Sequence, residues 1–267
     1  MGSVLGLYWR MVWARERGAM QYKLSFVLMS LSTMAFWIFE FVAIATFFRH
    51  VPHLGGWSFT EVAFLYGVGA TAFSVAEIFA TGFDELPRHI RQGTFDRVLV
   101  RPLGAFFQTF AAGLGFRRLG RIAQCVAITA VALALLGVEW RADKVAVLAL
   151  ALASGVAIYF SIFVAGAAYS FWTVQGTEIV NVFTNGGQFI TSYPLDAYAG
   201  WLRRALTFVI PLAFVGYYPV LYVLDRPAPM GLPDWTRLLS PLVAALFVLI
   251  AARAWSAGVR RYVSTGS

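Results

Sequence analysis

The sequence predicts an all-α membrane protein with about six transmembrane helices. Of its 267 residues 60% are hydrophobic and 13% are charged, whereas charged residues make up roughly 25% of an ordinary soluble domain. Several apolar stretches approach or exceed the roughly 20 residues that a helix needs to cross about 30 Å of hydrocarbon. The stretch VAVLALALASGVAIYFSIFVAGAA does not alternate between apolar and polar residues, as the strand of a membrane β-barrel would.

Six apolar stretches are candidate spans. The first is too long, and its flanks too plain, for a cleaved signal peptide, so we take Met1 as the start of the mature chain. The six predicted spans are Leu24–Phe48, Phe59–Phe79, Ile122–Val138, Val145–Val174, Ala205–Leu224 and Leu238–Ala257.

The distribution of basic residues predicts the orientation. With the N-terminus in the cytoplasm, sixteen Lys and Arg residues fall on the cytoplasmic side and five on the other, which places both termini in the cytoplasm. The net charge of +8 then reflects topology and contact with anionic lipid, not nucleic acid. The sixteen are Arg10, Arg15, Arg17, Lys23, Arg88, Arg91, Arg97, Arg101, Arg117, Arg118, Arg121, Arg203, Arg204, Arg253, Arg260 and Arg261, and the five are Arg49, Arg141, Lys144, Arg226 and Arg237.

Residues 1–21 are predicted to form an amphipathic helix that lies in the cytoplasmic interface. Leu5, Tyr8, Trp9 and Val12 recur at helical spacing, and Trp and Tyr favour the headgroup level. The alternative is a frayed basic tail.

A polar stretch, 82–102, follows the second span. Asp84 is a plausible N-cap for a short helix, Pro87 fits within its first turn, and Gly93 is a plausible stop. Thr94 can then cap a second short helix, FDRVLV, which Pro102 ends. We expect the two helices to form a compact knob on the cytoplasmic face.

Two further segments are predicted to lie at the cytoplasmic interface. Three arginines, Arg117, Arg118 and Arg121, cannot sit unpaired in hydrocarbon without costing roughly 3 kcal/mol each, so residues 105–116 before them form an interfacial helix or an inner extension of the third span. The mixed segment 177–201 is interrupted by glycines and a proline, and we expect a short interfacial helix there, anchored inside by the arginines at 203 and 204.

The chain carries no sign of energy-converting chemistry. A P-loop needs a lysine after GxxxxG, but the two lysines, Lys23 and Lys144, follow Tyr and Asp, so the chain is not expected to be an enzyme. No linker or short repeat divides it, and we treat residues 1–267 as one membrane domain. No cofactor or metal is expected: His50 and His53 lack companion ligands.

Glu40 is the most interesting of the acids inside the spans. An ionised carboxylate at that depth is costly unless it faces water or a partner. Glu40 could contact substrate, face a hydrated cleft, pair with an arginine of another subunit, or stay protonated inside the bundle.

Three segments carry a resemblance to a known family. The stretch IRQGTFDRVLVRPLGAFFQ is similar to the loop between spans two and three in the permease subunits of ABC-type exporters of the second, drug-export-like class (ABC type-2). The segments FVIPLAFVGYYPVLYVLDRP and ITSYPLDAYAGWLRR resemble a less characterised bacterial branch of these permeases. The interfacial helix, six spans and cytoplasmic termini extend the resemblance over most of the chain.

The resemblance implies a transporter of the bacterial cytoplasmic membrane driven by a separate ATPase. Two cytosolic ATPase subunits bind the ATP and Mg²⁺, and their closure rocks two permease subunits, of the same or related chains, between inward-open and outward-open states. The loop between spans two and three seats in the ATPase as a coupling helix. The residues expected to make that contact are Arg88, Ile90, Arg91, Gly93, Phe95 and Asp96.

The resemblance also implies outward transport through a cavity between two permeases. The external loops are short, which argues against capture of a bulky extracellular ligand. A hydrophobic or amphiphilic cargo fits the predicted lining, Phe36, Phe39, Glu40, Tyr66, Phe73, Tyr217 and Tyr218, although the same aromatic residues could simply pack.

Two other function classes stay open. An ion-coupled secondary transporter should show matched broken spans in two halves, and here prolines break only the predicted fifth span. A membrane-embedded lipid enzyme would need a convergent nucleophile, base and metal set that the sequence does not supply.

Overall fold

The computed structural model describes residues 6, 10, 13, 23–115, 118–173 and 181–262. The interfacial helix predicted at 1–21 therefore falls almost wholly outside the described residues. Within those ranges the regular secondary structure is helical, apart from one isolated bridge between Leu54 and Trp57. The predicted all-α class is confirmed.

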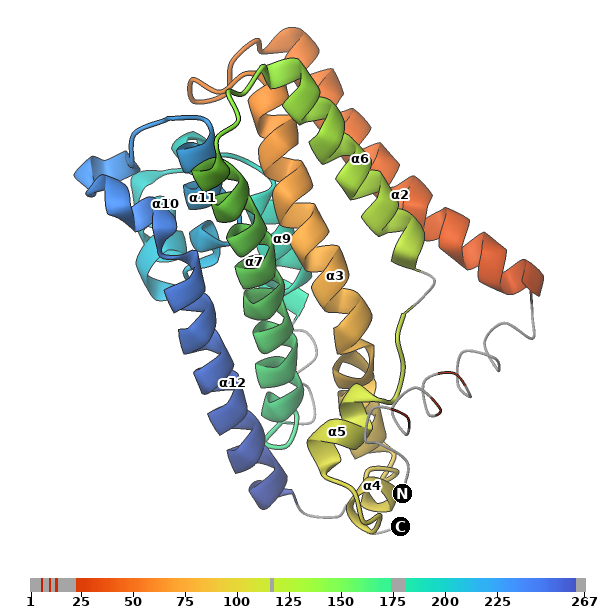
Figure 1. Ribbon diagram of the computed structural model, residues 1–267. Helices are drawn as coiled ribbons and strands as arrows, with labels where there is room; N and C mark the ends of the chain where they lie inside the picture. The colour runs from red at the N-terminus through yellow and green to blue at the C-terminus, as the bar shows by residue number, and fades with distance from the viewer. Residues whose placement is uncertain are drawn as a thin grey trace.

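Five long helices run side by side through the molecule (Figure 1). Each is long and apolar enough to cross a membrane, which confirms the first four predicted spans and the sixth. They are α2 (Lys23–His50), α3 (Phe59–Arg91), α6 (Leu119–Leu136), α7 (Ala142–Tyr169) and α12 (Ser240–Arg261). Helices α3 and α7 form the middle of the bundle, α12 covers one side, and α2 and α6 lie together on the other (Figure 1).

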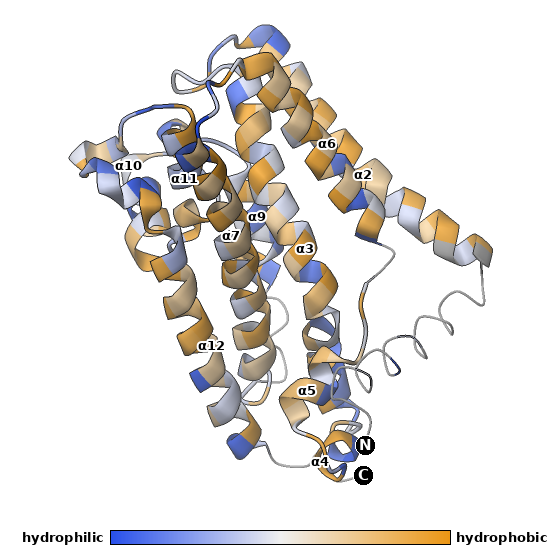
Figure 2. Cartoon of the chain, in the orientation of Figure 1, coloured by the Kyte–Doolittle hydropathy of each residue, from blue (hydrophilic) through white to orange (hydrophobic). Residues whose placement is uncertain are grey.

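The two ends of the bundle carry different structures. One end, called here the α4 end, holds the short helices α4 (Asp96–Leu99) and α5 (Ala105–Phe110). Helix α12 also ends there: the next residue, Tyr262, donates a hydrogen bond from its hydroxyl to Asp96 Oδ1 at 2.7 Å. The opposite end holds the loop 51–58. Most of α6, α7 and the middle of α12 consists of hydrophobic residues, and hydrophilic residues are more frequent toward the two ends of the bundle (Figure 2).

Helix α3 is the most buried of the spans. It begins in a capping box, in which Ser58 and Glu61 each accept a hydrogen bond from the other's backbone N–H. Its small residues allow close neighbours: a Cβ added at Gly67 would overlap the Thr129 hydroxyl of α6, and one at Gly82 would overlap the Thr109 carbonyl oxygen of α5. The sequence of α3 therefore places it at the centre of the fold.

Helix α3 does not end where the sequence predicts. We expected a new short helix to begin at Asp84, but α3 continues without a break to Arg91 and contains Pro87 in its interior. A proline removes one backbone hydrogen bond and usually bends a helix. Here Phe83, Leu86 and Ile90 pack into a hydrophobic cluster with α7 and α12, and that burial keeps the last two turns helical.

The predicted fifth span, 205–224, is wrong. Residues 200–223 form α10 (Gly200–Arg204), η3 (Ala205–Val209), η4 (Leu212–Phe214) and α11 (Tyr217–Val223). The first arm, Gly200–Val209, and the second arm, Leu212–Val223, are bent by 77° relative to each other. Pro211 lies at the bend, where it fixes the backbone and removes a donor.

The first arm starts, and the second arm finishes, at the opposite end of the bundle. In the first arm, Arg203 lies 3.9 Å from Asp196, which accepts a hydrogen bond from Trp57 at that end. After the second arm, Arg226 pairs with Glu61 at 2.7 Å. The segment is therefore a re-entrant hairpin.

Residues 171 and 196 lie at different ends of the bundle. Phe171 packs on Phe95 at the α4 end, whereas Asp196 accepts a hydrogen bond from Trp57 at the opposite end. The described residues between them include α9 (Asn185–Thr191) and lead to η2 (Leu195–Ala197). Two single-turn elements, η5 (Pro229–Gly231) and η6 (Asp234–Leu238), then lead into α12.

The re-entrant hairpin also corrects the predicted side of two arginines. Arg203 and its neighbour Arg204 begin the hairpin at the opposite end, not at the cytoplasmic end as expected. Moving these two changes the predicted distribution of the 21 basic residues from sixteen against five to fourteen against seven. The excess at the α4 end persists.

Candidate functional site

The end of α3 is fixed by a Schellman turn. The Gly93 N–H donates to the Ile90 carbonyl at 3.1 Å and the Thr94 N–H donates to the His89 carbonyl at 3.0 Å, which are the two hydrogen bonds of that motif. Gly93 has a φ of 65°, which glycine adopts without steric cost. The predicted stop at Gly93 is confirmed.

Thr94 does not cap the next helix as predicted. Its hydroxyl turns back to α3, where it donates to the His89 carbonyl at 3.2 Å and lies 2.9 Å from the His89 ring nitrogen Nδ1. Phe95 occupies the N-cap position of α4. The turn is consequently tied to α3 rather than to the helix that follows.

The loop after α4 is held by one buried glutamine. Gln108 of α5 donates from Nε2 to the Val98 carbonyl at 2.8 Å and to the Leu103 carbonyl at 2.7 Å. These two bonds span 98–103 and fasten it to α5. Helices α4 and α5 and the loop between them therefore form one fixed unit at the end of α3, called here the α4 unit.

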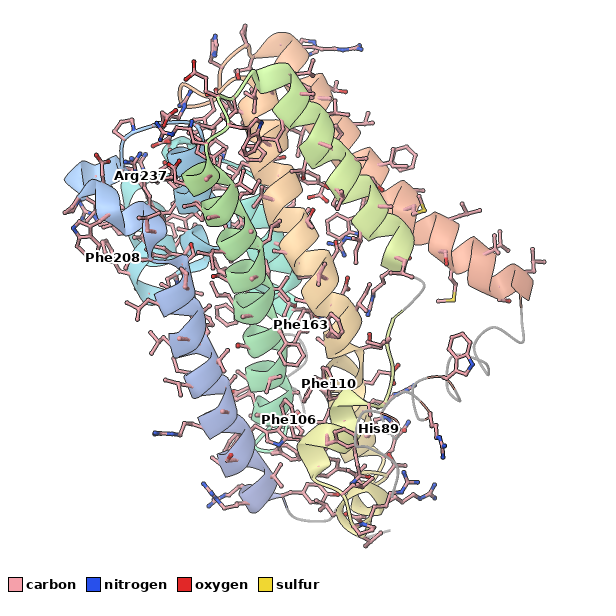
Figure 3. All side chains as sticks on the ribbon, viewed as in Figure 1. His89, Phe106, Phe110, Phe163, Phe208 and Arg237 are labelled. Atoms are coloured by element: carbon pink, nitrogen blue, oxygen red, sulfur yellow. The ribbon has the colours of Figure 1, made fainter. Side chains whose placement is uncertain are left out.

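An aromatic cluster joins this unit to α7 and α12. The Phe83 ring lies 5.1 Å from Phe106, 5.5 Å from Phe160 and 5.3 Å from Trp255, measured between ring centroids. Phe106 and Phe110 of α5 point into the same region, close to α7 (Figure 3). Packed interiors transmit displacement because they resist compression. A push on α4 would therefore reach α3, α7 and α12 together.

The predicted coupling residues divide into surface and interior. Arg88 and Arg91 are exposed, and Arg88 lies 3.7 Å from Glu85. Ile90 and Phe95 are buried in the core, where Phe95 packs on Phe171 and Tyr262. The expectation that these two side chains lie on the docking surface is corrected: they hold the unit's shape.

Two predicted coupling residues have structural partners and two surface residues were missed. Gly93 forms the turn, and Asp96 accepts the hydrogen bond from Tyr262. The missed residues are Leu99 and Val100, and Val100 is 83% exposed at the tip beyond α4. The signal was available in the sequence, as an aliphatic pair between Arg97 and Arg101 that precedes a proline.

A second candidate site lies among α2, α3 and α6. Arg121 is only 1% exposed, and its Nη1 donates to Glu77 Oε2 at 2.7 Å. Its guanidinium lies over the Trp37 ring at 3.3 Å and the Phe73 ring at 4.8 Å, as a desolvated cation–π contact does. Arg121 was predicted at the membrane interface on the premise that it has no partner, and the structure corrects that premise, because Glu77 and two aromatic rings supply partners that the sequence does not show.

Arg118 extends this cluster toward the α4 end. It donates to the Glu77 carbonyl at 3.3 Å and to the Thr81 hydroxyl at 3.0 Å, and it lies 3.4 Å from the Glu77 carboxylate and 3.9 Å from that of Asp84. Arg117 lies outside the described residues. Acidic and basic groups thus alternate along one face of α3, in the order Asp84, Arg118, Glu77, Arg121.

Glu40 lies beyond Arg121, deeper in the bundle. The Tyr66 hydroxyl donates to Glu40 Oε2 at 3.5 Å. Among the described residues, Glu40 Oε1 is buried without a hydrogen-bond partner, as are Arg121 Nε and Nη2.

The predicted substrate-lining residues do not come together in one place. Phe36 and Phe39 are 66% and 72% exposed on the outer face of α2. Tyr66 and Phe73 are buried beside the Arg121 cluster. The two tyrosines of α11 are buried at the opposite end, where Tyr217 donates to Asp196 at 2.6 Å and Tyr218 stacks on Phe214.

Three comparisons with known proteins bear on these sites. A family model described as ABC-2 family transporter protein matches residues 25–266. No curated protein and no solved structure matches the chain. The matched range includes every element of both candidate sites.

Proposed function

Because the chain belongs to the ABC-2 family of transporter proteins, we propose that it is the permease subunit of an exporter driven by a separate cytosolic ATPase. The chain is a multi-pass membrane component of such a transporter. ATP and Mg²⁺ are bound by the ATPase, and this chain supplies the path and the coupling surface. The cargo is a hydrophobic or amphiphilic molecule.

One observation carries the coupling role: α3 is a single continuous helix that reaches from the loop 51–58 into the α4 unit. Its 33 residues span about 50 Å at 1.5 Å per residue, while the hydrocarbon core is about 30 Å thick. The helix is therefore about 20 Å longer than the hydrocarbon core is thick, so its α4 end reaches past the hydrocarbon. The Schellman turn, the Gln108 bonds and the aromatic cluster make its projecting end rigid, which a lever requires.

The surface of the α4 unit suits contact with a protein. Exposed arginines, Arg88, Arg91, Arg97 and Arg101, surround the exposed apolar tip at Val100. Interfaces commonly combine a small apolar anchor with charged residues around it, which set orientation and association rate. We assign ATPase contact to these exposed side chains, with Ile90, Gly93, Phe95 and Asp96 maintaining the geometry behind them.

The assembly contains two permeases and two ATPases. The exposed apolar face of α2, with Phe36 and Phe39, is available to a second permease of the same or a related chain or to lipid. The exposed arginines near the α4 end, among them Arg88, Arg91, Arg97 and Arg101, support a cytoplasmic α4 end with both termini inside, in the cytoplasmic membrane of a bacterium.

The test is affinity purification of the chain from its native membrane in mild detergent, with identification of the proteins that accompany it. We expect a P-loop ATPase with the unaltered chain and its loss with Arg91→Glu. The matched control is Arg253→Glu. Arg253 is an exposed arginine in the half of α12 that is nearer the α4 end, and this variant should retain the ATPase.

The competing function is ion-coupled secondary transport. If no ATPase accompanies the chain in several mild detergents, while the helical content and elution volume are normal, the coupling proposal fails. Dependence of transport on a proton or sodium gradient would then support the competitor.

A further inference from the structure

A pocket of about 160 Å³ opens between the early part of α2 and the late part of α3. Met29 and Thr33 line it from α2, Thr81 and Asp84 from α3, and Arg118 from the turn before α6. We call it the lateral pocket. Its wall combines an apolar side chain, hydroxyls and charges of both signs, unlike a purely apolar groove between spans.

The lateral pocket lies at headgroup depth if the membrane begins where α3 begins. Asp84 is 25 residues beyond Phe59, which is about 37 Å along the helix at 1.5 Å per residue, and this exceeds the roughly 30 Å of hydrocarbon. The α2 residue Met29 is 52% exposed and belongs to the apolar first span. The pocket therefore joins the polar headgroup layer to a surface that faces acyl chains.

The lateral pocket offers two carboxylates to an amine. Asp84 and Glu85 line it together with the Arg118 guanidinium, and each carboxylate has one long ion pair, Asp84 with Arg118 at 3.9 Å and Glu85 with Arg88 at 3.7 Å. Asp84 is 41% exposed and Glu85 30% exposed at the side chain, so both can reach a ligand. A primary ammonium carries three donors, which two carboxylates can accept.

The guanidinium supplies the matching site for a phosphate. Arg118 keeps part of its surface accessible, at 25% of the side chain, and its contacts with Glu77, Thr81 and Asp84 are made through Nη1 and Nη2, not through Nε. Guanidinium groups recognise phosphate oxygens through several donors. An amine and a phosphate separated by a two-carbon link would thus meet opposite charges within one pocket.

We propose that the lateral pocket binds the head group of an aminophospholipid such as phosphatidylethanolamine. The ammonium lies between Asp84 and Glu85, the phosphate lies at Arg118, and the acyl chains leave past Met29 along α2. This inference names the cargo class for the proposed permease and rests on it only in that respect.

The test is lipid binding to the purified chain alone, by native mass spectrometry with phosphatidylethanolamine, phosphatidylcholine and phosphatidylglycerol of identical acyl chains. We expect phosphatidylethanolamine to bind about fivefold more tightly than the other two, the ratio for one partly exposed charge pair. Phosphatidylcholine lacks ammonium N–H donors, and phosphatidylglycerol lacks the amine. The double variant Asp84→Asn, Glu85→Gln should bind the three lipids equally.

The matched control is Asp143→Asn, a carboxylate at the opposite end of the bundle whose side chain is 41% exposed, like that of Asp84, and which should keep the preference. Equal binding of the three lipids by the unaltered chain, or an unchanged preference in the double variant, would overturn the proposal. The ATPase plays no part in this measurement. A chain that co-purifies with an ATPase but shows no lipid preference would therefore contradict the lipid site without contradicting the proposed function.

Discussion

Replacing Glu77 with glutamine should destabilise the bundle by leaving Arg121 buried without its counter-charge. In the native structure the ion pair is 2.7 Å long, with 2% of the Arg121 side chain and 14% of the Glu77 side chain exposed. Removing one partner of a buried pair typically costs about 3–5 kcal/mol, because the remaining charge has lost its compensation.

The structure places the expected cost at the lower end of that range. The Trp37 and Phe73 rings still face the guanidinium, and a desolvated cation–π contact contributes about 2 kcal/mol. The glutamine carbonyl can also accept one hydrogen bond. We therefore expect the free energy of unfolding to fall by about 3 kcal/mol.

The companion variant Arg121→Met should cost less than Glu77→Gln. It removes the buried cation altogether, while Glu77 keeps Arg118 at 3.4 Å, and methionine can fill the space between the rings. In the double variant the damage should be smaller than in Glu77→Gln alone, which is the non-additivity expected of two residues in contact.

The assay is equilibrium unfolding in mixed detergent micelles, followed by tryptophan fluorescence and helical content. Arg141→Gln is the control, because Arg141 and Asp143 form an exposed pair near the start of α7, and its loss should leave the transition unchanged. A loss below about 1 kcal/mol for Glu77→Gln, the range of exposed pairs, would refute the account of a buried, functionally placed ion pair.

Three further outcomes follow from local geometry. Gly82→Val should prevent normal packing of α5 on α3, because even a Cβ there overlaps the Thr109 carbonyl oxygen; faster proteolysis within 98–110 would show it. Gly93→Ala should cost about 1 kcal/mol, since residue 93 has a φ of 65°, and should weaken ATPase association, measured by co-purification. Asp196→Asn should cost about 1.5–3 kcal/mol, because its Oδ2 accepts hydrogen bonds from Trp57 and Tyr217; a midpoint of thermal unfolding equal to that of the unaltered chain would contradict this.

The spans that the sequence predicts correctly are those whose length and hydropathy leave one solution. An apolar run of about 17 residues or more can cross the hydrocarbon and must satisfy its backbone as a helix there, so α2, α6, α7 and α12 follow from composition. Gly93 is predictable for a similar reason, because the turn that ends α3 uses a conformation that favours glycine.

The hairpin at 200–223 was not predictable from hydropathy. Its residues are as apolar as a span, and what distinguishes it is that Arg203 and Arg226 bond to groups at the same end of the bundle. Arg203 bonds to Asp196, which is close in the sequence, whereas 165 residues separate Arg226 from its partner Glu61. Long-range pairing of this kind leaves no local pattern in the sequence.

Arg121 shows the same limit at the candidate site. The cost of an unpaired arginine in hydrocarbon predicts an interfacial position. The premise that Arg121 is unpaired does not hold, because Glu77 and Trp37 lie on two other helices that meet it. In the α4 unit, residue types marked the polar segment after α3 but did not indicate which of its side chains face outward. Ile90 and Phe95 look suited to a partner's pocket, yet the core of the chain itself takes them.

The most direct test of the coupling role is crosslinking from the tip of the α4 unit. Cys125 is the only cysteine of the chain and is fully buried, so Cys125→Ser with Val100→Cys places a single exposed thiol at the tip. A thiol-linked photoreactive probe at this position should capture the ATPase in native membranes, while the same probe at Trp235→Cys, exposed at the opposite end, should not. Capture of an ATPase from residue 235, or its absence at residue 100 in a complex that still contains the ATPase, would contradict the account.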